Sequence, residues 1–217
     1  MSSPASLSSA RVVAGALCGA SLMMTSPAHA EVSASLSIAS QYLWRGQSLS
    51  SNAALSGALD YDHRSGFYLG GWTTSLDESI EYDLYGGYRG QQGDWQYDLG
   101  YVGYFYPDAS PDNMQEAYLK LGYGGFGAEA YFGVGDYGWG GNAVRNRDNY
   151  FLLRYQYQKF GVAAGYYDHS AADYTHLDVS YEAYPGLVFT ASQIVQQDAP
   201  KPWDNALQVM VAYTFTF

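Results

Sequence analysis

The sequence predicts an all-β fold, namely a transmembrane, antiparallel, up-and-down β-barrel of about twelve strands. Three observations predict this fold. Residues 207–217 alternate between large apolar and mostly small or polar side chains and end on Phe217, which is typical of a strand with one apolar face. Tyr (23) and Gly (25) are abundant, whereas charged residues make up only 14% of the chain, against about 25% in soluble domains. Short and long connections also alternate along the chain, as they do in outer-membrane barrels.

The N-terminus has the features of a secretory signal peptide. Arg11 supplies a positive charge, residues 12–24 form an uncharged apolar run, and residues 28–30 (Ala-His-Ala) form a cleavage site of the small-x-small kind. The apolar run is shorter than the roughly 20 residues that a membrane-spanning helix needs. We therefore predict a cleaved signal peptide over residues 1–30 and a single barrel domain over residues 31–217.

The composition of the chain excludes several classes of function. The only cysteine, Cys18, lies in the predicted signal peptide, so the mature chain would have neither a disulfide nor thiol chemistry. The formal net charge is −11, which argues against nucleic-acid binding because that function needs a basic surface. No later segment is apolar for long enough to predict a transmembrane helix.

The predicted strands follow the signal peptide in close succession. Their ranges are 32–44, 53–62, 66–74, 79–90, 94–106, 114–123, 126–135, 148–157, 160–167, 174–182, 187–196 and 204–217. Most approach the roughly 9–11 residues of a tilted membrane strand. Residues 66–74 fit either orientation, because Phe67 and Leu69 alternate with Tyr68 and Trp72, and the strand 187–196 is ambiguous near Gln193.

The apolar row of these strands is predicted to face lipid. In the first half of the chain it comprises Leu36, Ile38, Tyr42, Leu55, Leu59, Tyr61, Ile80, Tyr82, Leu84, Tyr88, Trp95, Tyr97, Leu99, Tyr101 and Phe105. In the second half it comprises Leu119, Leu121, Tyr123, Phe126, Phe132, Val134, Phe151, Leu153, Tyr155, Phe160, Val162, Tyr166, Leu177, Val179 and Tyr181. Aromatic residues near the strand ends are typical of the girdles at the two membrane interfaces.

The connections fall into two classes. The short ones are 62–66, 90–93, 124–125, 158–159 and 183–186, and they are rich in Gly, Pro and polar residues, as hairpin turns are. The long ones are 45–52, 73–79, 107–113, 136–148, 168–173 and 197–203. Because such barrels have short periplasmic turns and long external loops, this alternation predicts that both termini lie on the periplasmic side.

The row opposite the apolar row is predicted to line the lumen. It supplies the candidate selectivity residues Glu81, Asp83, Asp98, Glu116, Lys120, Glu129, Arg154 and Asp178, in which carboxylates outnumber cations. Two interpretations stay open. The charges either pair into a packed polar plug, or they line a wet, narrow lumen that favours cations. A barrel of twelve strands lies between the filled eight-stranded barrels and the wide sixteen-stranded pores.

Catalytic and metal-binding motifs are weak in this sequence. His176, Asp178 and Ser180 share one face of a strand, but successive same-face residues lie about 6.5–7 Å apart, too far for direct Ser–His contact without leaning side chains. His169 lies among Asp168 and Asp173 in a predicted acidic loop. We predict no catalytic residue, no metal site and no cofactor, and thus not an enzyme, with a lipid-modifying barrel enzyme as the least favoured hypothesis.

The predicted loop 136–148 is the longest connection, and it carries Arg145 and Arg147. These arginines make it the most basic part of an acidic chain. Three interpretations stay open: the loop folds inward as a constriction, its arginines contact lipopolysaccharide phosphates, or it is a plain surface loop.

Three stretches of the sequence, namely 41–48, 60–72, and 81–88 followed by 93–101, together resemble a proteobacterial family of TorF-type porins. The resemblance covers nearly all of the mature chain. It implies an outer-membrane barrel and a channel, and it supplies no catalytic residues. Its most distinctive parts are Arg45-Gly46 and residues 65–68, which we interpret as turn and girdle structure rather than as substrate contacts.

The sequence therefore predicts a channel in the outer membrane of a Gram-negative bacterium, for passive diffusion of small polar, cationic solutes through a narrow acidic lumen. The alternative is a plugged structural or surface-interaction barrel without conductance. The expected partners are the lipid bilayer, lipopolysaccharide, a small-molecule solute and the barrel-insertion machinery, which would read the C-terminal strand ending at Phe217.

Overall fold

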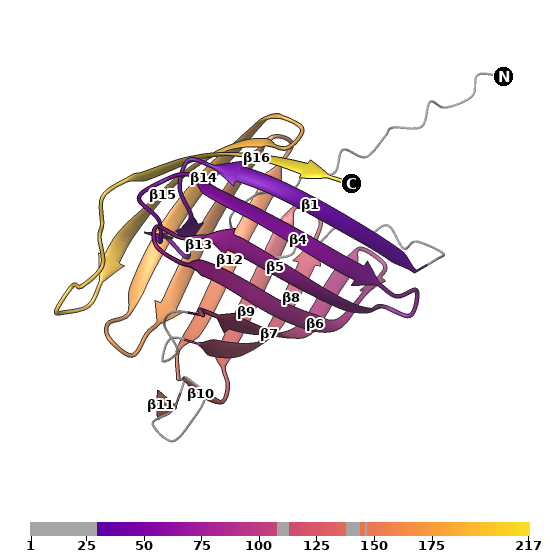
Figure 1. The fold of residues 1–217 in the computed structure, drawn as a ribbon, viewed down its shortest axis with the longest axis horizontal. Helices are drawn as coiled ribbons and strands as arrows, with labels where there is room; N and C mark the ends of the chain where they lie inside the picture. Colours follow the sequence, from indigo (N-terminus) through magenta and orange to yellow (C-terminus); the bar gives the residue numbers. More distant parts are fainter. Residues whose placement is uncertain (1–29, 108–112, 138–143, 146) are drawn as a thin grey trace.

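The computed structural model describes residues 30–107, 113–137, 144–145 and 147–217, in which twelve strands form one closed antiparallel barrel (Figure 1). These strands are β1 (Glu31–Ala39), β4 (Ala54–Asp62), β5 (Phe67–Ser75), β6 (Ile80–Gln92), β7 (Trp95–Phe105), β8 (Met114–Tyr123), β9 (Phe126–Gly133), β12 (Asn149–Tyr157), β13 (Phe160–Asp168), β14 (Tyr174–Tyr184), β15 (Leu187–Gln197) and β16 (Gln208–Thr216). The predicted fold class is confirmed.

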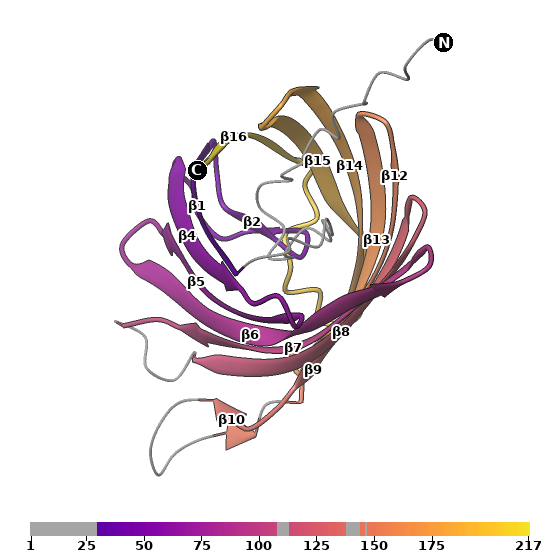
Figure 2. The same cartoon turned by 90° about the vertical axis from the view of Figure 1, so that its right-hand side faces the viewer.

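The remaining four strands form two small hairpins outside the barrel sheet. One pairs β2 (Leu43–Trp44) with β3 (Gln47–Ser48), and the other pairs β10 (Asp136–Tyr137) with β11 (Val144–Arg145). The second hairpin extends beyond the barrel end in Figure 1, whereas Figure 2 shows that the first turns back into the ring.

Closure of the barrel joins the first strand to the last. Each barrel strand pairs with the next along the chain, and β1 pairs with both β4 and β16, so the sheet has no free edge. Leu36 lies opposite Phe215 and Ala39 opposite Ala212 across this closing pair, which is visible as two adjacent ribbons in Figure 1. Closure gives each barrel strand a partner on both sides, as lipid requires.

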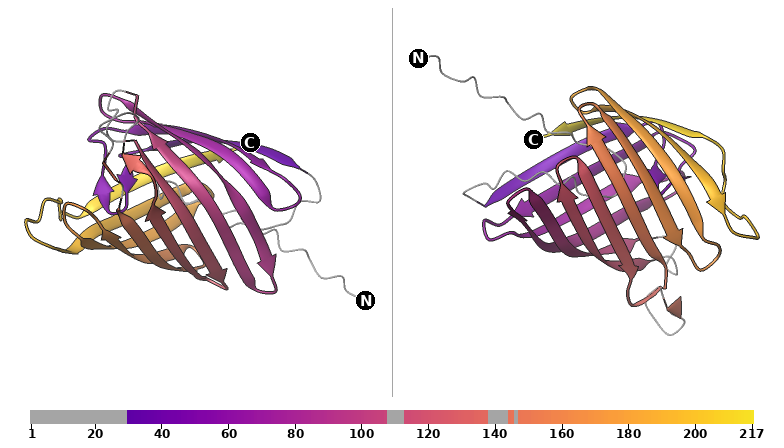
Figure 3. Two further views of the ribbon diagram at one scale, coloured as in Figure 1. Left: turned by 90° about the horizontal axis from the view of Figure 1, so that it is seen from below. Right: turned by 180° about the vertical axis from the view of Figure 1, so that it is seen from behind.

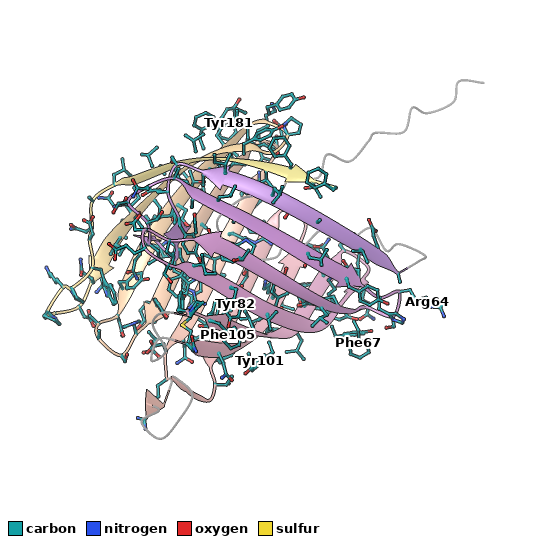
Figure 4. All side chains as sticks on the ribbon, viewed as in Figure 1. Arg64, Phe67, Tyr82, Tyr101, Phe105 and Tyr181 are labelled. Carbon is teal, nitrogen blue, oxygen red and sulfur yellow. The ribbon has the colours of Figure 1, made fainter. Side chains whose placement is uncertain are left out.

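The outer face of the barrel is apolar, as the period-2 pattern predicts. Leu153 in β12, for example, is 66% exposed, while its neighbour Leu152 is buried inside. Figure 4 shows Phe67, Tyr82, Tyr101 and Phe105 pointing away from the wall. Exposed Leu, Val, Ile and aromatic side chains recur on all twelve strands, and such a surface is stable only against lipid.

Aromatic pairs lie near both ends of the strands. Tyr82 stacks on Phe105 with ring centroids 5.2 Å apart, near the ends that carry the long loops. Trp95 and Tyr123 lie 4.8 Å apart at the opposite ends, next to the short turns. These pairs have the positions that interfacial girdles require.

Two ambiguous strands are resolved by the structure. In β5, Phe67 and Leu69 face outward and Tyr68 is buried. In β15, Val195 faces outward and Ile194 is buried.

The first predicted strand is too long at its C-terminal end, and one residue of the predicted lipid-facing row is wrong. The strand ends at Ala39 instead of residue 44, and Tyr42 is only 2% exposed. Ser40 donates its backbone N–H to Val211, and the chain then leaves the wall. The last strand begins at Gln208 rather than at residue 204. Both errors lie where a strand passes into a polar loop.

The two classes of connection lie at opposite ends of the barrel, as the views in Figure 3 show. Gly66, Gly93, Gly124 and Gly186 have positive φ in the short turns, where a side chain would be strained. Within the described residues, no helix has the length and apolar character to cross a bilayer. The predicted signal peptide lies outside the described residues except for Ala30, so its cleavage stays a prediction.

Candidate functional site

The connection between β1 and β4, residues 40–53, folds into the barrel and is called the lumen hairpin below. Figure 2 shows β2 inside the ring of strands. Arg45 and Gly46 form the two-residue turn between β2 and β3, with φ of 48° and 84°. Two positive φ values are the signature of a type I′ turn, which normally selects Asn or Gly at its first position. An arginine there indicates that the side chain is required at the tip.

The Arg45 guanidinium forms a bidentate ion pair with Glu116 on β8. Its Nη1 and Nη2 donate to the two carboxylate oxygens at 2.9 and 2.6 Å. Both residues are buried, with exposures of 4% and 0%. Tyr104 donates its hydroxyl to the same carboxylate at 2.9 Å. A buried arginine is stable only with such a satisfied partner.

Aromatic rings enclose the same guanidinium. Its central carbon lies 4.4 Å from the ring centroid of Tyr150, 5.0 Å from that of Tyr167 and 5.1 Å from that of Tyr131. Trp44, on the hairpin itself, lies 4.4 Å away. These distances are within the range of cation–π attraction. We call Glu116, Tyr131, Tyr150 and Tyr167 the cation cage.

The tip of the hairpin also contacts β14. Tyr174 of β14 donates its hydroxyl to the Arg45 carbonyl at 2.9 Å, and Gln47 donates to that hydroxyl at 2.6 Å. Gly46 packs so closely on His176 that a Cβ would lie 2.6 Å from the histidine Cβ. Together with the ion pair to β8, these contacts carry the hairpin across the lumen.

A second charged layer lies nearer the short turns. Glu129 accepts hydrogen bonds from Arg154 at 3.1 Å and from Tyr131 at 3.0 Å. Lys120, in register with both Asp98 and Glu129, lies 4.6 Å from the ring centroid of Tyr118. Asp98 also accepts the hydroxyl of Tyr68 at 2.6 Å. Arg154 and Glu129 therefore form an ion pair, as the plugged interpretation expects.

A hydrogen-bonded chain runs along β14 beside the cage. Tyr150 bonds to His176 Nε2 at 2.9 Å, His176 Nδ1 bonds to Asp178 at 2.9 Å, and Ser192 donates to the same carboxylate. The serine is Ser192 of β15 rather than the Ser180 considered from the sequence. It contacts the carboxylate and not the imidazole, which is the wrong order for nucleophilic activation.

All eight predicted selectivity residues lie on the inner row, and all but the partly buried Arg154 are buried. Their role in selectivity stays a prediction. Arg145 lies in β11, paired by backbone with Asp136, and Arg147 is exposed before β12. Most of the rest of that loop lies outside the described residues.

Not every inner carboxylate pairs with a cation. Asp60 accepts the hydroxyl of Tyr85 at 2.6 Å, and Glu81 accepts that of Tyr42 at 3.1 Å. Asp62, by contrast, pairs with Arg89. The inner wall therefore contains two kinds of carboxylate. Some accept a tyrosine hydroxyl group, and others form an ion pair with an arginine.

The base of the lumen hairpin is fixed by the loop between β5 and β6. Ser51 donates its backbone N–H to both carboxylate oxygens of Asp77 at 2.9 Å, and the Asn52 backbone adds a bond at 3.2 Å. The hydrogen bonds from Ser51, followed by those from Asn52, lower the pKa of the Asp77 carboxyl below its usual value. The loop after β5 thus holds the hairpin where it re-enters the wall.

His169 lies in the loop between β13 and β14. Its ring packs edge-on against Trp203 at 4.7 Å and lies 3.4 Å from Asp148. Burial lowers the pKa of this imidazole despite the neighbouring carboxylates. In the described part of the chain, no group of three or more His, Cys, Asp or Glu side chains is arranged to hold a metal ion.

The fold and the inward hairpin define a closed antiparallel β-barrel with an internal loop. The chain belongs to the family described as "Bacterial protein of unknown function (Gcw_chp)", whose model matches residues 24–214. The TorF resemblance is thereby neither confirmed nor contradicted. No curated protein matches the sequence.

Solved structures that share the fold include two that this chain covers almost completely. One is "KdgM porin", with a TM-score of 0.54, 11% identity, and coverage of 85% of this chain and 99% of that one. The other is "KdgM porin in complex with disordered oligogalacturonate", with a TM-score of 0.52, 9% identity, and coverage of 86% and 98%. At these identities the likeness concerns the fold.

Sequence reasoning missed the central residue of the site. Arg45 and Gly46 form a turn, as predicted, but it lies inside the barrel, so the girdle interpretation is wrong for Arg45. The available signal was an arginine beside glycine at a turn position, flanked by Trp44 and Tyr42 in a connection that should be polar.

Proposed function

We propose that this protein is a channel in the outer membrane of a Gram-negative bacterium, for small polar solutes that carry positive charge. The observation that carries this proposal is the lumen hairpin, which crosses a barrel whose inner row is rich in carboxylates. The hairpin would set the narrowest point of the path. The short turns and both termini would face the periplasm, with the hairpin near the external mouth.

The charge of the lumen supports a preference for cations. The eight predicted selectivity residues comprise six acids and two bases, to which the hairpin adds Arg45. Asp60 adds a further carboxylate on the inner row. An excess of fixed negative charge raises the local concentration of cations in a confined path. The ligand of the KdgM complex is an acidic sugar polymer, and such a wall would repel it, so we do not carry that ligand over to this chain.

Single-channel recording under a salt gradient tests the proposal. Purified protein without its predicted signal peptide should give discrete steps with a reversal potential of cation-selective sign. Asp60→Asn combined with Glu81→Gln should shift that potential toward zero, because both side chains keep their hydroxyl partners while losing charge. The control is Glu78→Gln with Asp94→Asn, two exposed positions at the barrel ends. An equal shift in the control, or no shift in either, contradicts the assignment of selectivity.

A second candidate function is the plugged barrel, and the burial of the inner residues favours it. Glu116, Tyr174 and His176 have 0% exposure, so the lumen at the level of the cage is filled by side chains. A folded barrel that stays silent, even when the tip of the hairpin is trimmed by Arg45→Gly, would support a structural role. Steps that grow larger after that substitution would support the channel.

A further inference from the structure

The cation cage is held together by residues of the wall. Glu116 accepts the hydroxyl of Tyr104, Tyr131 donates to Glu129, and Tyr150 bonds to His176, at 2.9, 3.0 and 2.9 Å. None of these bonds involves the lumen hairpin. The carboxylate and rings would therefore keep their positions if Arg45 left, which makes the cage a preorganised site.

The present occupant of the cage is carried by a strained turn. Arg45 has a φ of 48°, a left-handed backbone conformation that residues other than Gly and Asn rarely adopt. The hairpin that carries it is anchored at its base by Asp77 and held at its tip by Tyr174 and the cage. Arg45 is thus a tethered cation, which competes with a free solute at an effective concentration set by the hairpin.

We propose that the cation cage is a binding site for guanidinium-bearing solutes, which Arg45 occupies until such a solute replaces it. The fork of the guanidinium group matches the Glu116 carboxylate, and its flat face matches the rings of Tyr131, Tyr150 and Tyr167. An ammonium ion offers no such bidentate fork. This inference rests on the proposed function, because it names the class of solute for the same lumen.

The experiment empties the cage and refills it with a small molecule. Arg45→Gly removes the guanidinium and leaves a residue that suits the positive φ, so the turn is preserved. Ethylguanidinium, added at millimolar concentration to the purified variant, should raise its thermal unfolding midpoint saturably. It should also block any current through the variant over the same concentration range. Wild-type protein should need about tenfold more ethylguanidinium, because its tethered arginine competes.

Three controls make the result specific. Urea has the shape of guanidinium without its charge, and ethylammonium has the charge without the fork, so both should leave the Arg45→Gly variant unchanged. Arg45→Gly with Glu116→Gln should lose the response because the carboxylate is neutralised. Arg89→Gly removes another inner arginine that lies outside the cage, and it should respond as the wild type does.

The outcomes separate this inference from the channel proposal. Saturable stabilisation of a silent variant would support the site and contradict the channel. Conducting variants that treat ethylguanidinium and ethylammonium alike would support the channel and overturn the site. No response of the unfolding midpoint in the Arg45→Gly variant would also overturn the site.

Discussion

At the scale of single residues, Arg45 combines a strained backbone with many contacts inside the lumen. A left-handed conformation at a residue other than glycine costs about 1–3 kcal/mol. Each cation–π contact returns about 0.5–2 kcal/mol, and the bidentate pair to Glu116 satisfies the charge. Strain at one backbone position is therefore offset by contacts that only an arginine makes.

Removing the partner of that arginine should destabilise the barrel strongly. Glu116→Gln leaves a buried guanidinium without its counter-charge, and breaking one side of a buried pair costs about 3–5 kcal/mol. The measurement is urea unfolding of the protein refolded in lipid vesicles. Glu78→Gln, on an exposed loop, is the control and should change stability by less than about 0.5 kcal/mol. Equal stability of the two variants would show that the ion pair contributes nothing.

The partly buried His169 should make stability depend on pH. Burial lowers its pKa below the value of about 6.5 that it has in the unfolded chain, so between the two pKa values the unfolded state binds more protons. The contribution is present above about pH 6.5 and is lost as the pH falls through the folded pKa. The wild type should thus lose more unfolding free energy than His169→Asn between pH 8 and pH 5. Parallel losses would contradict this assignment.

At the scale of elements, the strands follow from the alternation of two environments. Every second side chain faces lipid and the others face the lumen, so period-2 patterning predicts the barrel strands with ends in error by a few residues. The same pattern fails where a strand leaves the wall. Leu36, Ile38 and Tyr42 occupy alternate positions of one continuous pattern in the sequence. The chain nevertheless turns inward after Ala39, and Tyr42 bonds to Glu81 inside the barrel.

The position of the hairpin depends on contacts that local pattern does not contain. The bond from Arg45 to Glu116 joins residues 71 positions apart, and that from Tyr174 joins residues 129 positions apart. The alternation of apolar and polar residues along the strands is enough to predict which residues form the inner row. It does not predict which of these side chains form ion pairs, because that depends on the register and curvature of the closed sheet.

The exterior of β12 offers a test of membrane depth. Leu153 lies at the middle of the strand and is 66% exposed, so Leu153→Arg should cost about 2–4 kcal/mol in a bilayer. Phe160→Arg, at the start of β13 beside a short turn, should cost only about 0–1 kcal/mol. Unfolding in vesicles measures both. Similar costs for the two would contradict the assigned membrane position.

The anchor of the lumen hairpin can be tested separately from its tip. Asp77→Ala removes the acceptor of the Ser51 and Asn52 amides, so hydrogen exchange of these two amides should accelerate. The lowered pKa of Asp77 means that the anchor persists down to pH values below the usual carboxyl range and is lost as the pH falls through that pKa. Asp94→Ala, in an exposed turn, should leave both amides unchanged.

At the scale of the whole molecule, two kinds of interior meet in one barrel. Arg154 forms an ion pair with Glu129, and Lys120 is buried in register with the same glutamate, as in a plug. Within the described residues, Asp60 and Glu81 accept tyrosine hydroxyl groups and form no ion pair, as a cation path requires. The lumen hairpin contacts both kinds of interior, since Arg45 pairs with Glu116 and Tyr42 bonds to Glu81. We expect its position to determine whether the barrel conducts.

The place of the hairpin in the chain also bears on how the molecule is assembled. It lies between β1 and β4, and β1 is the strand that closes the barrel against β16. The partners of its tip, Arg45, lie on β8, β9, β12, β13 and β14, which follow it in the sequence and must be paired before they can receive it. Contacts so distant along the chain form late because they require large loops to close. The first loop of the chain is therefore among the last parts to reach its native contacts, and closure must enclose Arg45 rather than leave it outside.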